Sequence, residues 1–251
     1  MTLCFEKVMR YGIISDIHSN LEALTEVLTI LKKSSIDQYL CLGDIIDYGA
    51  DPSPCVELVK SLDPIIVIGN HEWAFFHPEI IDSFNEYAKK SIVWTAEQIS
   101  VSQKNYLNSL PLTQEKENFI FVHSSLEKPE KFNYVFSLRD LQMNFQLLKK
   151  KICFFGHSHI PGIYVYNPGE RKVEILPETE VKFENGKNYL VNVGSVGQPR
   201  DRNPAASFGI YDTEKKILWI KRCFYEVKKA QEKIVRAGLP EFLAERLALG
   251  K

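Results

Sequence analysis

The chain has 251 residues, enough for one large domain or two small ones, and its 45% hydrophobic and 25% charged content is typical of globular proteins. Its 31 basic and 32 acidic residues give a net charge of -1, so no broad electrostatic attraction draws it to a long nucleic acid or an anionic membrane. The longest apolar runs, such as 64–68, are far too short to span a bilayer.

The N-terminal residues and the cysteines bear on where the chain starts and on the compartment in which the protein works. The first residues contain no uninterrupted apolar stretch ahead of a small-residue cleavage site, so we expect no signal peptide. Met9 directly precedes the first convincing strand, which leaves Met1 and Met9 as alternative starts, residues 1–8 being a loose extension in the second case. The five cysteines are scattered without a C-x-x-C pair, which favours reduced, buried thiols in a cytoplasmic protein.

A short pattern recurs along the first two thirds of the chain. A run of mostly apolar residues, rich in Ile, Val and Phe, is followed at once by a polar residue that can bind a metal ion. Runs of this kind predict buried strands, here at 11–15, 38–42, 64–68, 118–122 and 151–155. The polar residues that follow are Asp16, His18, Asp44, Asn70, His71, His123, His157 and His159.

The segments between these runs predict helices at 20–33, 52–62 and 137–149. In the first of them Leu24, Val27, Leu28 and Leu31 fall on one helical face, and Asn20 or the preceding serine is available as the N-cap. Strands that alternate with helices indicate parallel strands joined by crossovers. Since ligands of such sheets bind at the carboxyl ends of the strands, we expect the polar residues to meet at one edge.

Two regions break this alternation. Residues 72–111 have a helical pattern with several aromatic side chains, and form either a lid beside the site or an extra helical pair packed on the sheet. After residue 161 the pattern changes to hairpins at 162–176 and 207–223, with a strand at 189–193 between them and a helix at 226–236. We expect a largely antiparallel second sheet to pack on the first. Without a flexible linker, the chain is interpreted as one α/β domain, 1–251, with a helical insertion at about 72–111.

The candidate ligands indicate the kind of metal site. Asp16 and His18, like His157 and His159, are two residues apart, so in extended backbone each pair points to one side. Imidazole, carboxylate and amide donors suit Mn, Fe or Zn and are poor for calcium, which prefers oxygen alone. The seven candidate ligands, which are the polar residues named above without His71, are too many for one tetrahedral site. They suit two ions that share a bridging carboxylate.

Together the motifs resemble the calcineurin-like metallophosphoesterases, the superfamily that includes bacterial phosphodiesterases and the serine/threonine protein phosphatases. The family pattern is D-x-H, G-D-x-x-D, G-N-H-[DE], a lone histidine after a strand, and G-H-x-H. It occurs here, in family order, at 16–18, 43–47, 69–72, 123 and 156–159. The stretch 192–204 also resembles the small single-domain bacterial and archaeal members.

The resemblance implies a four-layer αββα sandwich, in which two packed mixed sheets are flanked by helices. It also implies two divalent metal ions, for which Mn is the first choice and Fe, Zn, Ni and Co stay open. The implied ligands of the first ion are Asp16, His18 and His159, those of the second are Asn70, His123 and His157, and Asp44 bridges both.

The implied reaction is hydrolysis of phosphate esters, with phosphodiesters favoured, by attack of a hydroxide held between the ions. His71 would give a proton to the leaving oxygen or stabilise the transition state, with Glu72 orienting it and Asp47 as a further acceptor. Arg200 is a candidate phosphate contact, the alternative being a surface arginine after a tight turn. Two departures stand out: Ser124 replaces a common glycine, and Glu72 a common aspartate.

Several alternatives remain open for the function. A phosphomonoesterase or protein phosphatase and a dinucleoside polyphosphate hydrolase share the same ligand set, and a metal-binding scaffold of this fold is the non-enzymatic alternative. A scaffold would typically lack ligands or the histidine at position 71, and all are present. The short chain and balanced charge disfavour a DNA-repair nuclease. The expected partner is a small phosphate ester, while the oligomeric state stays open. His77 and the aromatic residues of 73–94 are interpreted as structural.

Overall fold

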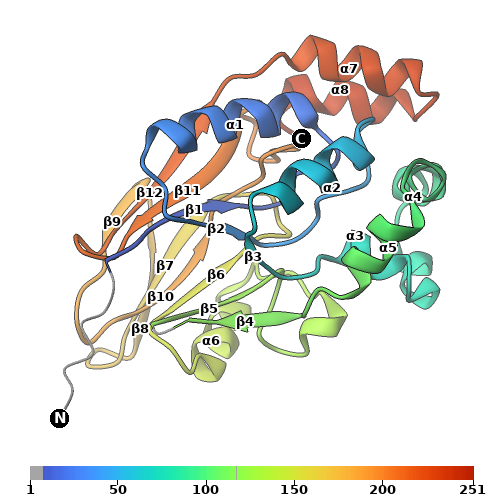
Figure 1. Ribbon diagram of the computed structural model, residues 1–251. Helices are drawn as coiled ribbons and strands as arrows, with labels where there is room; N and C mark the ends of the chain where they lie inside the picture. Colours follow the sequence, from blue (N-terminus) through green and yellow to red (C-terminus); the bar gives the residue numbers. More distant parts are fainter. Residues whose placement is uncertain (1–7, 117) are drawn as a thin grey trace.

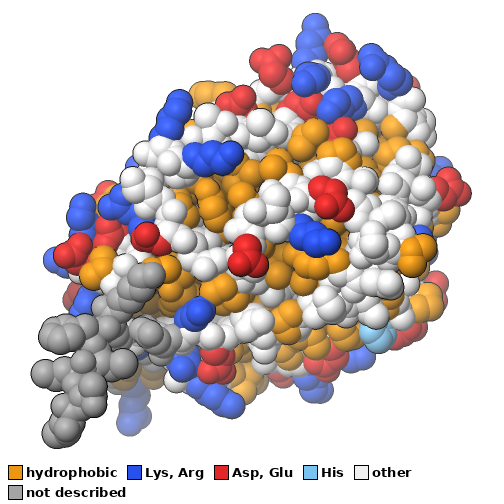
Figure 2. All heavy atoms as spheres, in the orientation of Figure 1, with side chains coloured by type: hydrophobic (Ala, Val, Ile, Leu, Met, Phe, Trp, Pro, Cys, Tyr) orange, Lys and Arg blue, Asp and Glu red, His pale blue; other side chains and the backbone are white. Residues whose placement is uncertain are grey.

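The structure is a computed structural model and describes residues 8–116 and 118–251. The proposed extension ahead of Met9 lies, up to residue 7, outside the described residues. Basic and acidic side chains are interspersed over the face of the molecule in view in Figure 2, in keeping with the net charge of -1. Among the described residues, no helix is both long and apolar enough to cross a membrane.

Two six-stranded sheets form the centre of the molecule (Figure 1). The first sheet has the strand order β3-β2-β1-β11-β12-β9. Strands β1, β2 and β3 are parallel, and the other three continue the sheet in antiparallel fashion. The bounds are β1 Arg10–Ile14, β2 Gln38–Cys41, β3 Ile65–Ile66, β9 Glu180–Lys182, β11 Ala206–Asp212 and β12 Ile217–Cys223.

The second sheet has the strand order β4-β5-β6-β10-β7-β8. Strands β5, β6 and β10 are parallel in its centre, with antiparallel strands on both sides. The bounds are β4 Thr113–Glu115, β5 Phe119–Val122, β6 Ile152–Phe155, β7 Gly162–Asn167, β8 Lys172–Leu176 and β10 Asn188–Asn192.

Alternate residues of each strand face the other sheet or the helices. Ile13 packs between the sheets with Leu40, Phe121 and Phe154, whereas the next residue, Ile14, packs under the helices. All of these side chains are fully buried, and each such burial stabilises the fold by about 1.5–3 kcal/mol. The core between the sheets therefore fixes how the two sheets sit face to face.

Helices cover the outer face of each sheet (Figure 1). Helices α1 Leu21–Lys33, α2 Pro52–Ser61, α7 Val227–Arg236 and α8 Glu241–Leu249 lie over the first sheet, and α6 Leu138–Leu147 lies over the second. Helix α1 begins where the Asn20 side chain accepts the backbone N–H of Ala23, and it buries the apolar face expected from its sequence. The layers are helix, sheet, sheet and helix, so the predicted fold class is confirmed.

The region 72–111 is helical, as expected. It contains α3 Asn70–Ala74, the 3₁₀ helix η1 Pro78–Ser83, α4 Glu86–Gln98 and α5 Val101–Asn108, grouped beyond the end of the first sheet (Figure 1). Ala88, Ile99 and Leu107 are buried in the core under the first sheet. Part of this region thus packs as an extra helical layer, while its role as a lid stays a prediction.

The expected division of the strands between the sheets is wrong. The five parallel strands do not share one sheet, because β1 to β3 lie in the first and β5 and β6 in the second. The later hairpins do not form a separate sheet either, since β11 and β12 extend the first sheet and β7, β8 and β10 the second. Each strand has the same apolar character in either sheet, so its sequence does not reveal its neighbour. The short strands β4 and β9 and the helix α8 were also not predicted.

Candidate metal centre

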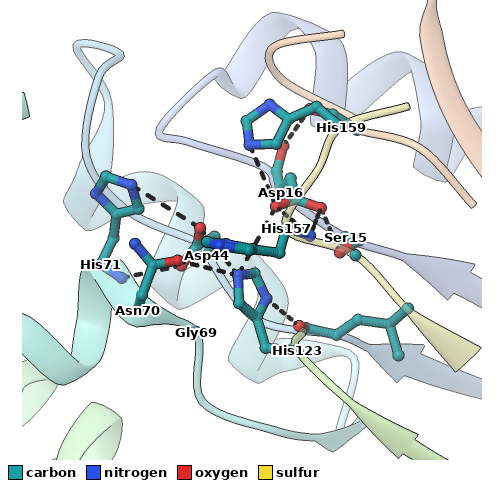
Figure 3. Close-up of polar contacts among 12 residues, drawn as sticks. Ser15, Asp16, Asp44, Gly69, Asn70, His71, His123, His157 and His159 are labelled. Atoms are coloured by element: carbon teal, nitrogen blue, oxygen red, sulfur yellow. Dashed lines mark hydrogen bonds and ion pairs between the residues drawn. The ribbon is translucent and has the colours of Figure 1, made fainter. Parts of the chain in front are cut away.

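The polar residues that follow the strands meet at the place where the carboxyl ends of the parallel strands of both sheets come together. Asp16 and His18 follow β1, Asp44 follows β2, His123 follows β5, and His157 follows β6. The structure brings all seven predicted ligands into one buried cluster, completed by Asn70 and His159, and each is at most 7% exposed. Figure 3 shows the side chains of Asp16, Asp44, Asn70, His123, His157 and His159 converging from separate elements.

The first group of donors consists of Asp16, His18, Asp44 and His159. Their ligand atoms all lie within 4.8 Å of one another. His159 Nε2 is 3.1 Å from His18 Nε2 and 3.3 Å from Asp16 Oδ1, and His18 Nε2 is 3.6 Å from Asp44 Oδ2. This arrangement can hold one metal ion.

The second group of donors consists of Asp44, His123 and His157, again within 4.8 Å of one another. His123 Nε2 is 3.2 Å from Asp44 Oδ2 and 3.2 Å from Asn70 Oδ1, which brings the amide oxygen into the same group. Asp44 belongs to both groups, so the two candidate ion positions are adjacent.

Backbone carbonyls orient three of the imidazoles. His18 Nδ1 is 3.1 Å from the Ile46 carbonyl oxygen, His123 Nδ1 is 2.6 Å from that of Leu42, and His159 Nδ1 is 2.6 Å from that of Gln198. A carbonyl accepts hydrogen bonds, so each Nδ1 carries a proton and each Nε2 faces the cluster, where His18 and His159, as neutral rings, present a lone pair.

The spacing of the donor atoms fits divalent cations. The facing Nε2 atoms of His18 and His159, 3.1 Å apart, both present lone pairs and would repel each other without a cation between them. Ligands at about 2.1 Å from a metal ion stand about 3 Å apart at neighbouring positions, which matches this separation and those around Asp44. The residues therefore fit the metal ions that the motifs imply.

Burial decides the protonation of the cluster. It holds the pKa values of His18, His157 and His159 well below the usual range, so these imidazoles are neutral and able to bind a metal. Burial also raises the pKa of Asp16 to about 6. Burial opposes ionisation of Asp44 too, but neighbouring imidazoles, His123 first, hold the pKa of its carboxyl well below the usual range. A cation would offset the cost of these buried carboxylates.

The ligand pairs lie in turns, not in extended backbone as expected. The φ angles of Asp16, His18, Asp44, His157 and His159 are 52°, 47°, 54°, 66° and 60°, all in the left-handed region. Each such residue costs on the order of 1 kcal/mol, and strain of this kind clusters at functional sites. The expected extended geometry is wrong because each strand ends before its ligand pair begins.

Glu72 anchors the turn that carries Asp44. Its carboxylate accepts backbone N–H groups from Asp44 at 2.9 Å, Ile45 at 2.7 Å, Ile46 at 3.1 Å and Gly69 at 3.0 Å. The predicted role of Glu72, to orient His71, is therefore wrong. Its carboxylate is directed at the backbone that positions Asp44.

The carboxylate that orients His71 is that of Asp47, at 2.5 Å from His71 Nδ1. The backbone N–H of His71 donates to Asp44 Oδ1 at 3.0 Å, and its Nε2 lies 4.0 Å from Asp44 Oδ2. Although burial opposes it, the charges of Asp44 and Asp47 raise the pKa of His71 above its ordinary value. His71 thus presents Nε2 beside the cluster and holds a proton more readily than free histidine.

Two motif glycines let the backbone approach the carboxylates. A Cβ at Gly69 would collide with the Asp44 side chain, and a Cβ at Gly156 would collide with Ser15 and come within 2.6 Å of Asp16 Oδ2. The G-N-H and G-H-x-H motifs therefore need glycine at these two positions, because a side chain there would collide with the residues at Asp44 and Asp16.

A pocket of about 530 Å³ opens beside the cluster. Arg200 lines it together with His71 and His157, so the structure places the predicted phosphate-binding residue at the site. The Arg200 guanidinium donates to Gln198 Oε1 at 2.8 Å, which holds it in place. Arg202, in contrast, is exposed, and its backbone N–H donates to the Gly250 carbonyl.

Some residues of the site had no role in the sequence interpretation. Phe84 lies within 73–94, which was interpreted as structural, yet it lines the pocket, as does Tyr134. Gln198 acts partly through its backbone carbonyl, for which no side-chain signature exists. His77 stacks on Trp73 with ring centroids 3.9 Å apart, in keeping with its structural interpretation.

Two packed mixed sheets with a buried carboxylate–imidazole cluster at their joined strand ends define a metal-binding α/β sandwich. Residues 9–216 match the model of the calcineurin-like phosphoesterase superfamily domain, and the chain belongs to this family. The family is metal-dependent, and membership supports a hydrolase that acts on phosphate esters.

Individual relatives agree with this assignment. An uncharacterized protein of Methanocaldococcus jannaschii is 42% identical over 96% of this chain and 98% of its own length. Phosphodiesterase YfcE of Escherichia coli is 25% identical over 82% of this chain and 89% of its own length. The crystal structure of a metallophosphoesterase from Sphaerobacter thermophilus is 35% identical, covers 98% of this chain and 100% of its own, and superposes with a TM-score of 0.84.

Proposed function

We propose that this protein is a phosphodiesterase that depends on two divalent metal ions. The observation that carries the proposal is the position of Asp44, whose carboxylate belongs to both donor groups and so can bridge two ions. The similarity to Phosphodiesterase YfcE supports diesters as the substrate class. The mixture of imidazole, carboxylate and amide donors suits Mn, with Fe, Zn, Ni and Co as alternatives.

In this proposal the ions and the protein have separate tasks. Bound divalent cations would supply Lewis acidity, which lowers the pKa of a coordinated water to about 7 and makes it a nucleophile at neutral pH. Asn70 contributes an uncharged oxygen, which limits the negative charge that an anionic substrate meets. Arg200, at the pocket wall, contacts a phosphate oxygen.

His71 acts on the leaving group. Its Nδ1–H is held by Asp47, so its Nε2 faces the cluster and delivers a proton to the oxygen that leaves phosphorus. Asp47 also favours the charged imidazole, which makes the proton available at neutral pH. Glu72 acts indirectly, because it holds the turn that positions Asp44.

The proposed setting is the cytoplasm, with a small phosphate ester as the partner. Cys41, Cys55, Cys153 and Cys223 are free and buried, which suits a reducing compartment.

The test is an assay of the purified protein supplied with Mn, in parallel with a measurement of bound metal by mass spectrometry. We expect two Mn ions per chain and faster hydrolysis of bis-p-nitrophenyl phosphate than of p-nitrophenyl phosphate. Turnover of the monoester alone would make the protein a phosphomonoesterase, and turnover of a dinucleoside polyphosphate alone would make it a hydrolase of that class. Retained metal with no turnover of any of these esters would favour a metal-binding scaffold.

A further inference from the structure

The pocket beside the metal cluster is larger than a phosphate group needs. Its volume of about 530 Å³ falls in the range of about 300–1,000 Å³ that is typical of pockets for whole small molecules. Beyond the cluster, its walls come mainly from two separate segments, 79–88 and 130–134, together with Tyr48 and Arg200. These walls must therefore contact the organic part of an ester whose phosphate lies at the cluster.

Aromatic rings on these walls lie directly against residues of the cluster. The Phe84 ring centroid is 5.0 Å from that of His71, and the Tyr134 ring stacks on His157 at 4.0 Å with an angle of 24° between the planes. An organic group on the phosphorus atom of a bound ester would therefore directly contact one of these rings. With the role proposed above for His71, the leaving group would lie toward Phe84, and the ester group that stays on phosphorus would lie toward Tyr134.

Tyr134 is available to a ligand and already ordered. Its side chain is 45% exposed although it belongs to a pocket, and exposed aromatic surface of this kind marks binding sites. Phe136, 61% exposed, stacks on Tyr134 with ring centroids 4.9 Å apart and an angle of 10°. This stack fixes the orientation of the Tyr134 ring before a ligand arrives, so little conformational entropy is lost on binding.

The same pocket contains two cationic side chains that a phosphate can meet. Arg200 and Lys131 line it and are accessible to a ligand, and the acidic Glu79 and Glu130 line it as well. A pocket with cations near the cluster and flat apolar rings beyond it fits a ligand with an anionic centre and a planar aromatic group.

We propose that this pocket selects phosphodiesters whose retained ester group is a planar aromatic ring, such as an aryl group or a nucleobase, and that Tyr134 is the specificity-determining residue. The proposal rests on the function proposed above and names the substrate class of that same site. The aromatic ring of the substrate contacts the exposed edge of Tyr134, whose two faces carry the rings of His157 and Phe136, while its phosphate lies at the metal cluster.

The test compares two diesters with the same leaving group, phenyl p-nitrophenyl phosphate and methyl p-nitrophenyl phosphate, by release of p-nitrophenolate. The phenyl ester is also more reactive in solution, so the deciding quantity is how the ratio of their kcat/KM values changes between proteins. We expect Tyr134→Ala to lower this ratio about tenfold, because the edge-to-face contact between the two rings is lost. Tyr134→Phe keeps the ring and should keep the ratio. Phe224→Ala, which removes an 85% exposed ring outside the pocket, is the matched control.

A binding measurement separates this proposal from the proposed function. Calorimetry on the Mn-loaded protein should give about tenfold tighter binding for phenylphosphonate than for methylphosphonate, and Tyr134→Ala should remove the difference. An unchanged kcat/KM ratio in Tyr134→Ala, or equal binding of both phosphonates to the unmodified protein, would overturn the selection of aromatic groups. If neither diester is hydrolysed while phenylphosphonate still binds more tightly, the phosphodiesterase proposal fails and the aromatic pocket stands.

Discussion

The metal cluster and the rim of the pocket differ in almost every physical respect, although they are in contact. The cluster is buried, its imidazoles are held by hydrogen bonds that they donate to backbone carbonyls, and its turns are strained. The rim around Tyr134 is half-exposed and held by ring stacking. This contrast is what we expect if, as proposed, the cluster positions the reacting groups and the rim selects the substrate.

The largest effect should come from breaking the feature that joins the two donor groups. Asp44→Asn removes a negative charge from both proposed ion positions, so we expect fewer than one Mn per chain and a loss of activity above about 10⁴-fold. Metal content and bis-p-nitrophenyl phosphate hydrolysis measure this. Two fully occupied positions in the variant would contradict the bridging role.

A smaller effect should come from His71, which contacts the cluster without belonging to either donor group. His71→Ala should keep both metal ions and lower kcat on the order of 10³-fold, because the proton for the leaving oxygen is lost. Asp47→Asn, which leaves the imidazole but removes its charged partner, should lower kcat by about 10–100-fold. Loss of metal from His71→Ala would show that this histidine is a ligand instead.

The support of the cluster can be tested through stability. Glu72→Ala removes the acceptor of four backbone N–H groups in a fully buried position, so we expect a loss of about 3 kcal/mol or more in the free energy of unfolding. Urea unfolding of the metal-free protein measures it. A loss below about 1 kcal/mol would mean that the turn before Asp44 is held by other contacts.

The rim should behave in the opposite way. Tyr134→Ala removes a half-exposed ring, so we expect the free energy of unfolding to change by about 0.5 kcal/mol or less, while the choice between substrates changes. The same urea experiment, run beside Glu72→Ala, gives the comparison directly. A large loss of stability would make Tyr134 a structural residue and weaken the contrast between the two regions.

The ligands of the cluster could be predicted from the sequence because each is recognised from residues next to it in the chain. Each ligand directly follows an apolar strand, so Asp16, Asp44 and His123 could be assigned from their immediate neighbours. The α/β class also followed from the alternation of apolar runs and helical segments, whereas the four-layer sandwich followed from the resemblance to the family. Short motifs are enough to predict these ligands, because the end of a strand and the ligand that follows it lie close together in the chain.

Features that depend on distant contacts escaped prediction. Whether a strand such as β5 joins the first or the second sheet depends on its partner, not on its own apolar residues. The roles of Glu72 and Asp47 are likewise visible only in three dimensions, because Glu72 is adjacent to His71 in the sequence, whereas Asp47, which contacts the imidazole, is 24 residues away. Tyr134 belongs to no motif, and it gains its role from stacking on His157.

The most direct test of the account is anomalous diffraction from crystals of the protein grown with Mn. The account predicts two Mn peaks about 3.5–4 Å apart, one on each side of the Asp44 carboxylate, with His18 and His159 at one ion and His123 and His157 at the other. The physical claim beneath everything else is that one carboxylate can neutralise and join two cations at the meeting point of two sheets. A single Mn peak, or peaks that do not contact Asp44, would contradict it.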